Sequence, residues 1–179
     1  MNKLINFILF QIGWFGCVLG GAHQFPWGGT VLSLGIVGFH LFRSDNTIRE
    51  LRVIASAVFL GFVFDGFLVY MRFLDYPSGI LISGTAPHWI LSMWAVFATT
   101  LNLSLGWLQK RYITAFIFGL FGGPAAYLGG SSMGGVIFLR EYEALLSLAV
   151  IWAVSMPLLI WISRVAEPDA GEKRVEGEI

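Results

Sequence analysis

The chain has 179 residues, of which 56% are hydrophobic and only 12% are charged, and its mean hydropathy is +0.75. Soluble domains contain about 25% charged residues, so this composition predicts an integral membrane protein with one domain of packed helices. The formal net charge is zero and the chain has a single cysteine, Cys17. Zero net charge gives no support for nucleic-acid binding, and one cysteine excludes a disulfide framework.

Apolar stretches of about 20 residues, separated by polar segments, predict an all-α bundle of six transmembrane helices with short loops. The predicted spans cover residues 4–22, 28–42, 48–73, 87–105, 112–128 and 144–163. They make up one transmembrane domain over residues 1–165. The last residues, 166–179, alternate acids, bases and glycine, which predicts a disordered cytoplasmic tail.

The first span has small residues, Gly13, Cys17 and Gly20, along one face, which is typical of close helix packing in lipid. His23 ends this span. The second span is short and rich in glycine, and His40 lies alone near its end. We keep it as a transmembrane helix because a re-entrant segment would move the next group of arginines to the opposite side of the membrane.

The third span contains Asp65 in the middle of an apolar run. An acid at this depth costs roughly 2.5 to 3.5 kcal/mol, so we expect it to face the bundle interior and to have a partner there. Arg72 lies two turns later on the same face, about 10.5 Å further along the helix. Asp65 either fixes the register of the bundle through hydrogen bonds or exchanges protons or binds a ligand, and both roles remain open.

The fourth span has a polar stripe with successive spacings of four and three residues, which places its members on one face. The stripe consists of His88, Ser92, Ala95, Thr99, Asn102 and Gly106. Such a face must point inward, either to hydrogen-bond neighbouring helices or to line a ligand cavity. The two alternatives are not separated by the sequence.

The fifth span repeats small residues on one face, and a proline in its second half predicts a kink. The face is formed by Ala115, Gly119, Gly122, Ala126 and Gly129. Six aromatic residues near the outer ends of spans predict an interfacial belt. These are Trp27, Tyr70, Tyr76, Trp89, Tyr127 and Tyr142.

The orientation follows from the lysines and arginines, which are more frequent in cytoplasmic loops. With six spans, nine of them fall on one side and only Arg72 and Arg140 fall on the other. Both termini are therefore expected in the cytoplasm. His23, Asp65, Arg72 and His88 then gather in the outer half of the membrane. The histidines lack metal-ligand spacing and no cofactor motif is present, so no metal site and no cofactor are predicted.

Several motifs, among them the segments 6–20, 94–102, 122–127 and 156–158 together with Asp65, resemble the bacterial inner-membrane family catalogued as domain of unknown function 2878. The resemblance covers nearly the whole chain except the tail. It implies location in the bacterial inner membrane. Members are said to occur beside genes for fatty-acid-modifying enzymes, which suggests a role linked to lipid. The matching positions, without assigned roles, are Gln11, Trp14, Cys17, Asp65, Asn102 and Pro124.

The leading hypothesis is a protein that binds or moves a lipid or a small amphipathic molecule in a polar cavity inside the membrane. The predicted ligand-binding residues are Asp65, Arg72, His88, Ser92, Thr99, Asn102, His23 and Gln11. One alternative is an integral-membrane enzyme of lipid modification. The other is a non-catalytic partner of a lipid-modifying enzyme, so whether the protein is an enzyme stays undecided. The sequence predicts neither the ligand nor the oligomeric state.

Overall fold

The computed structural model describes residues 1–166 and is helical apart from a very short β-ladder. The predicted tail lies outside the described residues, except for Ala166. The elements are α1 (Lys3–Ala22), α2 (Pro26–Phe42), α3 (Thr47–Tyr70), β1 (Leu74–Asp75), α4 (His88–Ala98), the 3-10 helix η1 (Gly106–Leu108), α5 (Tyr112–Ser132), β2 (Ile137–Phe138) and α6 (Glu141–Val165).

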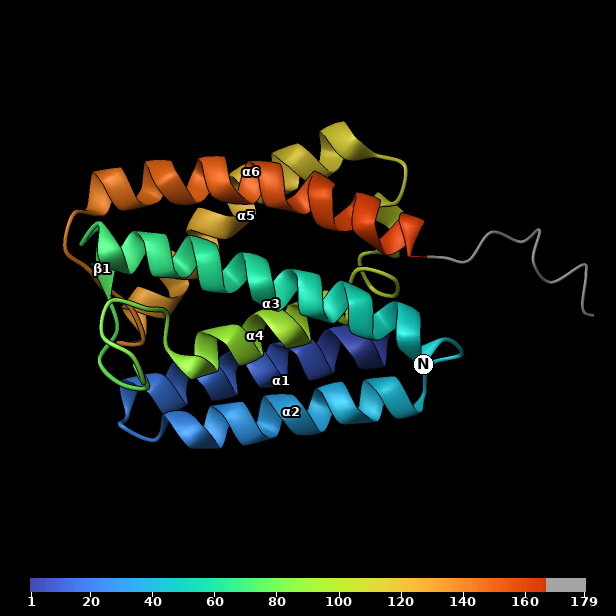
Figure 1. Cartoon of the computed structure of the whole chain (residues 1–179), viewed down its shortest axis with the longest axis horizontal. Helices are drawn as coiled ribbons and strands as arrows, with labels where there is room; N and C mark the ends of the chain where they lie inside the picture. The colour runs from blue at the N-terminus through green and yellow to red at the C-terminus, as the bar shows by residue number, and fades with distance from the viewer. Residues whose placement is uncertain (167–179) are drawn as a thin grey trace, which may run out of the picture.

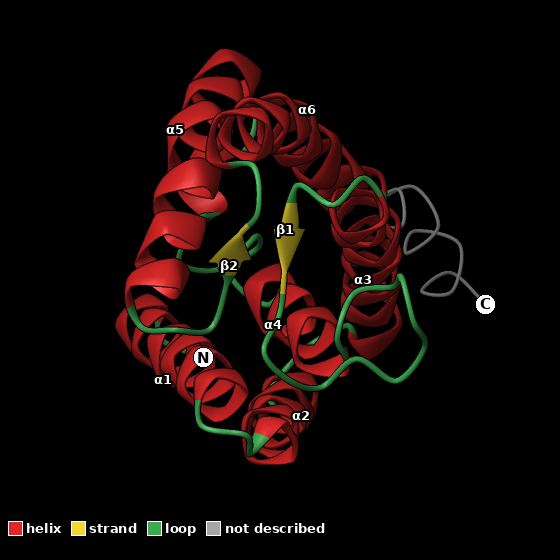
Figure 2. Cartoon of the chain, turned by 90° about the vertical axis from the view of Figure 1, so that its left-hand side faces the viewer, coloured by secondary structure: helices red, strands yellow, loops and turns green. Residues whose placement is uncertain are grey.

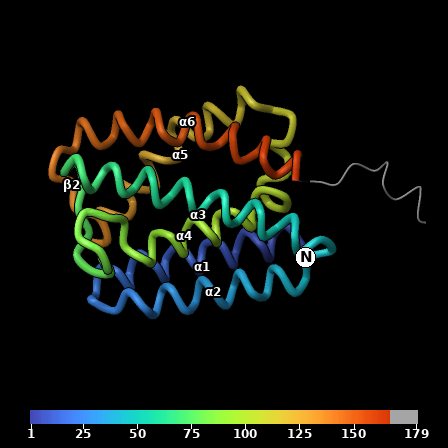
Figure 3. Tube along the Cα trace, viewed as in Figure 1, coloured from blue at the N-terminus to red at the C-terminus, as the bar shows by residue number. Residues whose placement is uncertain are grey.

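The six α-helices run alternately in opposite directions, so the start of α1 and the end of α6 lie at the same end of the bundle (Figures 1 and 3). At the other end, β1 pairs with β2 in antiparallel register, with Leu74 opposite Phe138 and Asp75 opposite Ile137. This ladder fastens the α3–α4 connection to the α5–α6 connection. We call the end with β1 and β2 the ladder end and the opposite end the terminal end.

Four helices, α1, α3, α5 and α6, are long and apolar enough to cross a membrane, which indicates a membrane protein. The other two are shorter. With a rise of 1.5 Å per residue, the 17 residues of α2 extend over about 26 Å and the 11 residues of α4 over about 16 Å, against roughly 30 Å for a bilayer core. The structure is thus the predicted all-helical bundle, and four of its six α-helices are candidate spans by length and composition.

The fourth predicted span is wrong in its second half. Helix α4 ends at Ala98, and residues 99–105 form successive turns. The hydroxyl groups of Thr99 and Thr100 donate to the carbonyl groups of Val96 and Phe97, at 2.7 and 2.6 Å. Threonine, serine and asparagine side chains compete in this way with continued helix formation, and this segment contains all three residue types.

Helix α4 occupies the centre of the bundle, with the other helices arranged around it (Figure 2). Its residues Trp89 and Val96 are fully buried, as are the hydroxyl-bearing Thr99 and Thr100 just beyond its end. This position explains how a helix can end halfway through the bundle. The backbone polar groups that lose their helical partners at the end of α4 lie against protein. In lipid these groups would have no hydrogen-bond partner.

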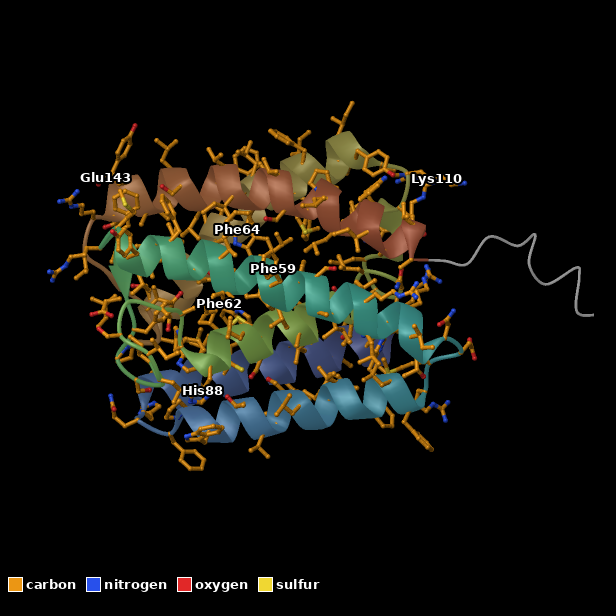
Figure 4. All side chains as sticks on the ribbon, in the orientation of Figure 1. Phe59, Phe62, Phe64, His88, Lys110 and Glu143 are labelled. Atoms are coloured by element: carbon orange, nitrogen blue, oxygen red, sulfur yellow. The ribbon has the colours of Figure 1, made fainter. Side chains whose placement is uncertain are left out.

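The outer faces of the long helices are apolar, as a lipid-facing surface requires. On α3, for example, Phe59 is 65% exposed and Phe62 is 46% exposed (Figure 4). The predicted aromatic belt is only partly right. Trp27, Tyr70 and Tyr142 are exposed, but Trp89, Tyr76 and Tyr127 are buried. These three aromatic residues point into the bundle because they contact one another or the Asp65 carboxylate.

Candidate functional site

Asp65 lies in the bundle interior, where three hydrogen-bond donors surround its carboxylate. The residue is 1% exposed, which confirms the predicted inward orientation. Its Oδ1 accepts a hydrogen bond from the Tyr76 hydroxyl at 2.8 Å and another from the Tyr127 hydroxyl, and its Oδ2 accepts one from Trp94 Nε1 at 2.8 Å. Hydrogen bonds to a charged acceptor contribute about 1.5–3 kcal/mol each. Asp65 therefore joins α3 to α4, to α5 and to the α3–α4 connection.

Local features of the sequence bring these donors to Asp65. Gly61 lies one turn before Asp65, and a Cβ atom at this position would lie 2.3 Å from Cδ1 of Trp94, so glycine gives the indole room to reach the carboxylate. Tyr76 follows β1, and its ring packs edge-on against Trp89 with 5.4 Å between centroids. Burial, with the nearby charge of Asp65, raises the pKa of the Tyr76 hydroxyl well above its usual value. Tyr76 thus stays a donor at neutral pH.

An apolar cavity of about 220 Å³ lies beside this cluster, between α1, α4, α5 and α6. Trp94 and Tyr127, two of the three donors to Asp65, form part of its wall. Phe7 on α1 and Phe118 on α5 also line the cavity and are 49% and 42% exposed, so the cavity reaches the outer surface between these two helices. A molecule in the surrounding lipid would enter by this side.

Some small residues of α5 pack closely against α6, and Gly122 leaves open space toward the cavity. A Cβ atom on Gly119 would lie 2.1 Å from the carbonyl oxygen of Trp152, and one on Gly123 would lie 2.3 Å from Trp152 Cγ. These glycines hold α5 tightly against α6. Gly122 also lines the cavity, but a Cβ atom there meets nothing closer than Phe118 at 3.8 Å. The predicted packing face is confirmed for Gly119, whereas Gly122 faces the cavity.

Trp152 on α6 contributes a polar atom to this otherwise apolar region. Its indole stacks on that of Trp94, with ring centroids 4.5 Å apart and an angle of 14° between the planes. Its Nε1 is buried near the Tyr127 hydroxyl but makes no hydrogen bond of normal geometry within the described residues. A buried donor without a partner costs about 1–3 kcal/mol, which a ligand with an oxygen atom would relieve.

A second polar cluster lies at the terminal end. Glu50 on α3 is 6% exposed, and both of its carboxylate oxygens accept hydrogen bonds, from Asn102 Nδ2 at 2.9 Å and from His40 Nε2 at 2.9 Å. Arg49 Nη2 donates to Asn102 Oδ1 at 3.2 Å and to the carbonyl oxygen of Ser163 on α6 at 3.1 Å. The cluster therefore connects α2, α3, the segment after α4, and α6. His40 is not alone, contrary to the prediction.

The structure separates the predicted ligand-binding residues. Asn102 is in the Glu50 cluster, and Glu50 precedes Asp65 by 15 residues on the same helix, or about 22 Å. Asp65 and Asn102 therefore belong to two separate hydrogen-bonded clusters. His23 and Arg72 are exposed at the ladder end, where Arg72 follows α3 with a left-handed φ of 55°. Gln11 is half-buried, and its side chain makes no hydrogen bond within the described part of the chain.

The remaining predicted residues belong to α4 and its end. His88 lies near the ladder end (Figure 4), and its ring stacks on Trp27. The distance from His88 Nδ1 to the hydroxyl oxygen of Thr30 is 2.7 Å. Ser92 donates to the carbonyl group of His88 at 3.0 Å, and Thr99 accepts from Asn6 Nδ2 at 3.4 Å. The stripe thus faces inward as predicted, and its hydroxyl groups form hydrogen bonds within the protein.

None of the eight predicted residues lines the apolar cavity. Their ligand-binding role stays a prediction. Sequence reasoning missed Trp94 and Tyr127 as partners of Asp65, and Glu50 altogether. Glu50 lies in the first turn of α3 between Arg49 and Arg52, where an acid is ordinary, so the local sequence gave no signal for its burial.

No group of three or more histidine, cysteine or acidic side chains arranged to hold a metal occurs within residues 1–166. A family model described as "Protein of unknown function (DUF2878)" matches residues 3–158. No curated protein and no solved structure matches the chain.

Proposed function

Since the chain belongs to the DUF2878 family, whose function is unknown, we propose from its geometry that it binds a lipid chain or a small amphipathic molecule in the apolar cavity. The observation that carries this proposal is the cavity of about 220 Å³, walled by aromatic side chains and glycine and open between α1 and α5. Four tryptophans contribute to the wall, Trp14, Trp89, Trp94 and Trp152. Apolar pockets with a few polar groups are the usual form of small-molecule sites.

The size of the cavity restricts the ligand. Pockets for drug-sized molecules usually have volumes of about 300–1,000 Å³, so this cavity accommodates one apolar chain or a small ring system, and a whole phospholipid is too large. The rest of a longer ligand would stay in the surrounding lipid beside Phe7 and Phe118.

The polar atoms near the cavity suggest how the ligand would be oriented. The buried Nε1 of Trp152 lies next to the Tyr127 hydroxyl but has no acceptor at normal hydrogen-bond geometry. A carbonyl, ether or hydroxyl oxygen on the ligand would supply that acceptor. We therefore expect an amphipathic molecule to bind more tightly than a pure hydrocarbon of the same size. No contact in the described residues specifically favours the alternatives of a lipid-modifying enzyme or of a partner for one.

Filling the cavity tests this proposal. In Gly122→Leu the new side chain occupies the cavity, because no atom lies closer than 3.8 Å to a Cβ atom at this position. Binding is measured by adding dibrominated stearic acid to the purified protein in detergent, where the bound acid quenches tryptophan fluorescence. We expect Gly122→Leu to bind the acid about ten-fold more weakly than the wild type, a difference of ~1.4 kcal/mol.

The matched control is Gly35→Leu, which makes the same change on the exposed face of α2, where a Cβ atom meets nothing within 4 Å. It should bind the brominated acid like the wild type. Equal affinity of the wild type and Gly122→Leu would show that the cavity is not the binding site.

We also propose that the protein lies in the bacterial inner membrane, crosses it six times and has both termini in the cytoplasm. The support is that the described basic residues gather at the terminal end, whereas Arg72 and Arg140 alone lie at the ladder end. Figure 4 shows Lys110 and Glu143 at opposite ends of the bundle.

Cysteine labelling tests this topology, because the native Cys17 is fully buried. Leu81→Cys is at the ladder end, at a residue that is 66% exposed, and Lys110→Cys is at the terminal end. In bacterial spheroplasts we expect a membrane-impermeant maleimide to label Leu81→Cys at once, and to label Lys110→Cys only after the membrane is opened. Labelling of both from the outside would contradict the six-crossing topology.

A further inference from the structure

A second cavity, of about 190 Å³, lies at the terminal end, beneath the turn that joins α2 to α3. Its wall is polar, in contrast to that of the cavity beside Asp65, and includes His40, Arg43, Ser44, Arg49 and Glu50. It therefore suits a different kind of ligand, and the inference below does not depend on the function proposed above.

His40 has one ring nitrogen without a partner. The residue is 4% exposed, and its Nε2 lies 2.9 Å from Glu50 Oε2. A carboxylate oxygen accepts, so Nε2 must carry a proton. The other nitrogen, Nδ1, is buried and has no hydrogen-bond partner among the described residues. A polar group of a ligand in the cavity would give this nitrogen a partner.

The cavity wall contains two arginines and two acids, and the buried acid among them is already hydrogen-bonded within the protein. The carboxylate of Glu50 is already occupied on both oxygens by His40 and Asn102. Arg49 lies beside it, and its guanidinium donates to Asn102 and to the Ser163 carbonyl group. Asp45 also lines the cavity and is exposed, so water screens its charge as it does that of Arg43.

Arg43 is the basic residue best placed to meet a ligand from outside. It lines the cavity, is exposed, and makes no side-chain hydrogen bond or ion pair within the described residues. Ser44 beside it has a hydroxyl group that accepts from the backbone N–H of Asn46, which leaves its own proton to donate. Arg43 and Ser44 thus offer donors to the space that the unpartnered Nδ1 of His40 also lines.

We propose that this cavity binds a phosphate-type anion, with the Arg43 guanidinium as the principal donor and the unpartnered Nδ1 of His40 as a second contact. Arginine suits phosphate because its planar group donates two parallel hydrogen bonds to two oxygens. The phosphate belongs either to the headgroup of an anionic phospholipid or to a soluble phosphate compound. Other basic residues at the terminal end, such as Lys110 and Arg111, would attract either one.

The test compares Arg43→Gln with Arg52→Gln, which removes an exposed arginine from the same end but outside the cavity wall. One arm measures retention of phosphatidylglycerol by native mass spectrometry of the full chain. The other measures binding of inorganic phosphate by calorimetry in nanodiscs of phosphatidylcholine alone. We expect Arg43→Gln to weaken binding about ten-fold in the arm that contains the natural phosphate ligand, either the lipid headgroup or the soluble compound. Arg52→Gln should match the wild type in both arms.

A loss confined to phosphatidylglycerol assigns the site to a lipid headgroup, and a loss in the inorganic phosphate arm assigns it to a soluble compound. Absence of binding in both arms, or an equal loss in the two arginine variants, would overturn the proposal. His40→Gln is the second variant, because the glutamine amide can still donate to Glu50 but places no nitrogen at the Nδ1 position. It should also weaken binding, and wild-type affinity in this variant would overturn the assigned site.

Discussion

Replacing Asp65 by asparagine should lower the free energy of unfolding by about 2–4 kcal/mol. An asparagine keeps one oxygen and replaces the other by an amide nitrogen, which cannot accept a hydrogen bond. At least one of the three donors, Trp94 Nε1 or a tyrosine hydroxyl, then loses its acceptor in the buried interior. The hydrogen bonds that remain lose the charge of the acceptor. The measurement is equilibrium unfolding of the purified protein in mixed micelles of a mild detergent and dodecyl sulfate.

Asp45→Asn makes the same chemical change at an exposed residue in the α2–α3 turn, and should change the unfolding free energy by less than about 0.5 kcal/mol. Equal stability of the wild type and Asp65→Asn would contradict the role of Asp65 as a buried hydrogen-bond acceptor that joins helices. The variant also bears on ligand binding, because Trp94 and Tyr127 line the apolar cavity. Once their shared acceptor is altered, both side chains are less fixed in the wall.

Adding one methyl group at Gly119 should destabilise the protein by about 1–3 kcal/mol. The new Cβ atom would lie 2.1 Å from the carbonyl oxygen of Trp152 and 2.9 Å from Cγ of Met156. The first of these atoms belongs to the backbone, so it cannot move without shifting α6. Helices α5 and α6 would have to separate, and helices in lipid associate mainly through such close packing. The same unfolding measurement in mixed micelles applies.

Gly122→Ala is the matched control, since it lies on the same helix less than one turn away. Its Cβ atom would make only ordinary contact with Phe118 at 3.8 Å. Alanine is favoured over glycine in a helix interior by about 0.5–1 kcal/mol, so this variant should be as stable as the wild type or slightly more stable. Similar losses in both variants would mean that helix propensity or cavity shape, and not contact with Trp152, controls the effect.

The two cavities differ in how they depend on the rest of the fold. The apolar cavity lies where α5 and α6, packed on each other, meet α1 and α4. The polar cavity lies at the turn between α2 and α3, and its wall is held by Glu50 and the residues bonded to it. Gly119→Ala should therefore disturb the first cavity far more than the second. Comparison of fatty-acid and phosphate binding in this variant would separate the two sites.

The sequence alone determined most of the helices and the inward orientation of Asp65. The physical reason is local: a segment in lipid must satisfy its own backbone hydrogen bonds and be long enough to cross, so hydropathy reveals it. The cost of an acid in lipid likewise requires Asp65 to face protein whatever the partner is. The packing role of Gly119 follows from the spacing of small residues on one face of its helix.

The hydrogen-bond partners of the buried polar residues follow only from the tertiary structure. The three donors to Asp65 are 11, 29 and 62 residues away in the chain, and nothing in their local sequence distinguishes them from interfacial aromatic residues. The early end of α4 depends on its central position, where surrounding protein accepts a broken helix that lipid would not. The pairing of His40 with Glu50 and the division of the polar residues between two ends of the bundle also arise from how the helices pack. Hydropathy indicates whether a residue avoids lipid, but the packing of the helices determines which residue it contacts.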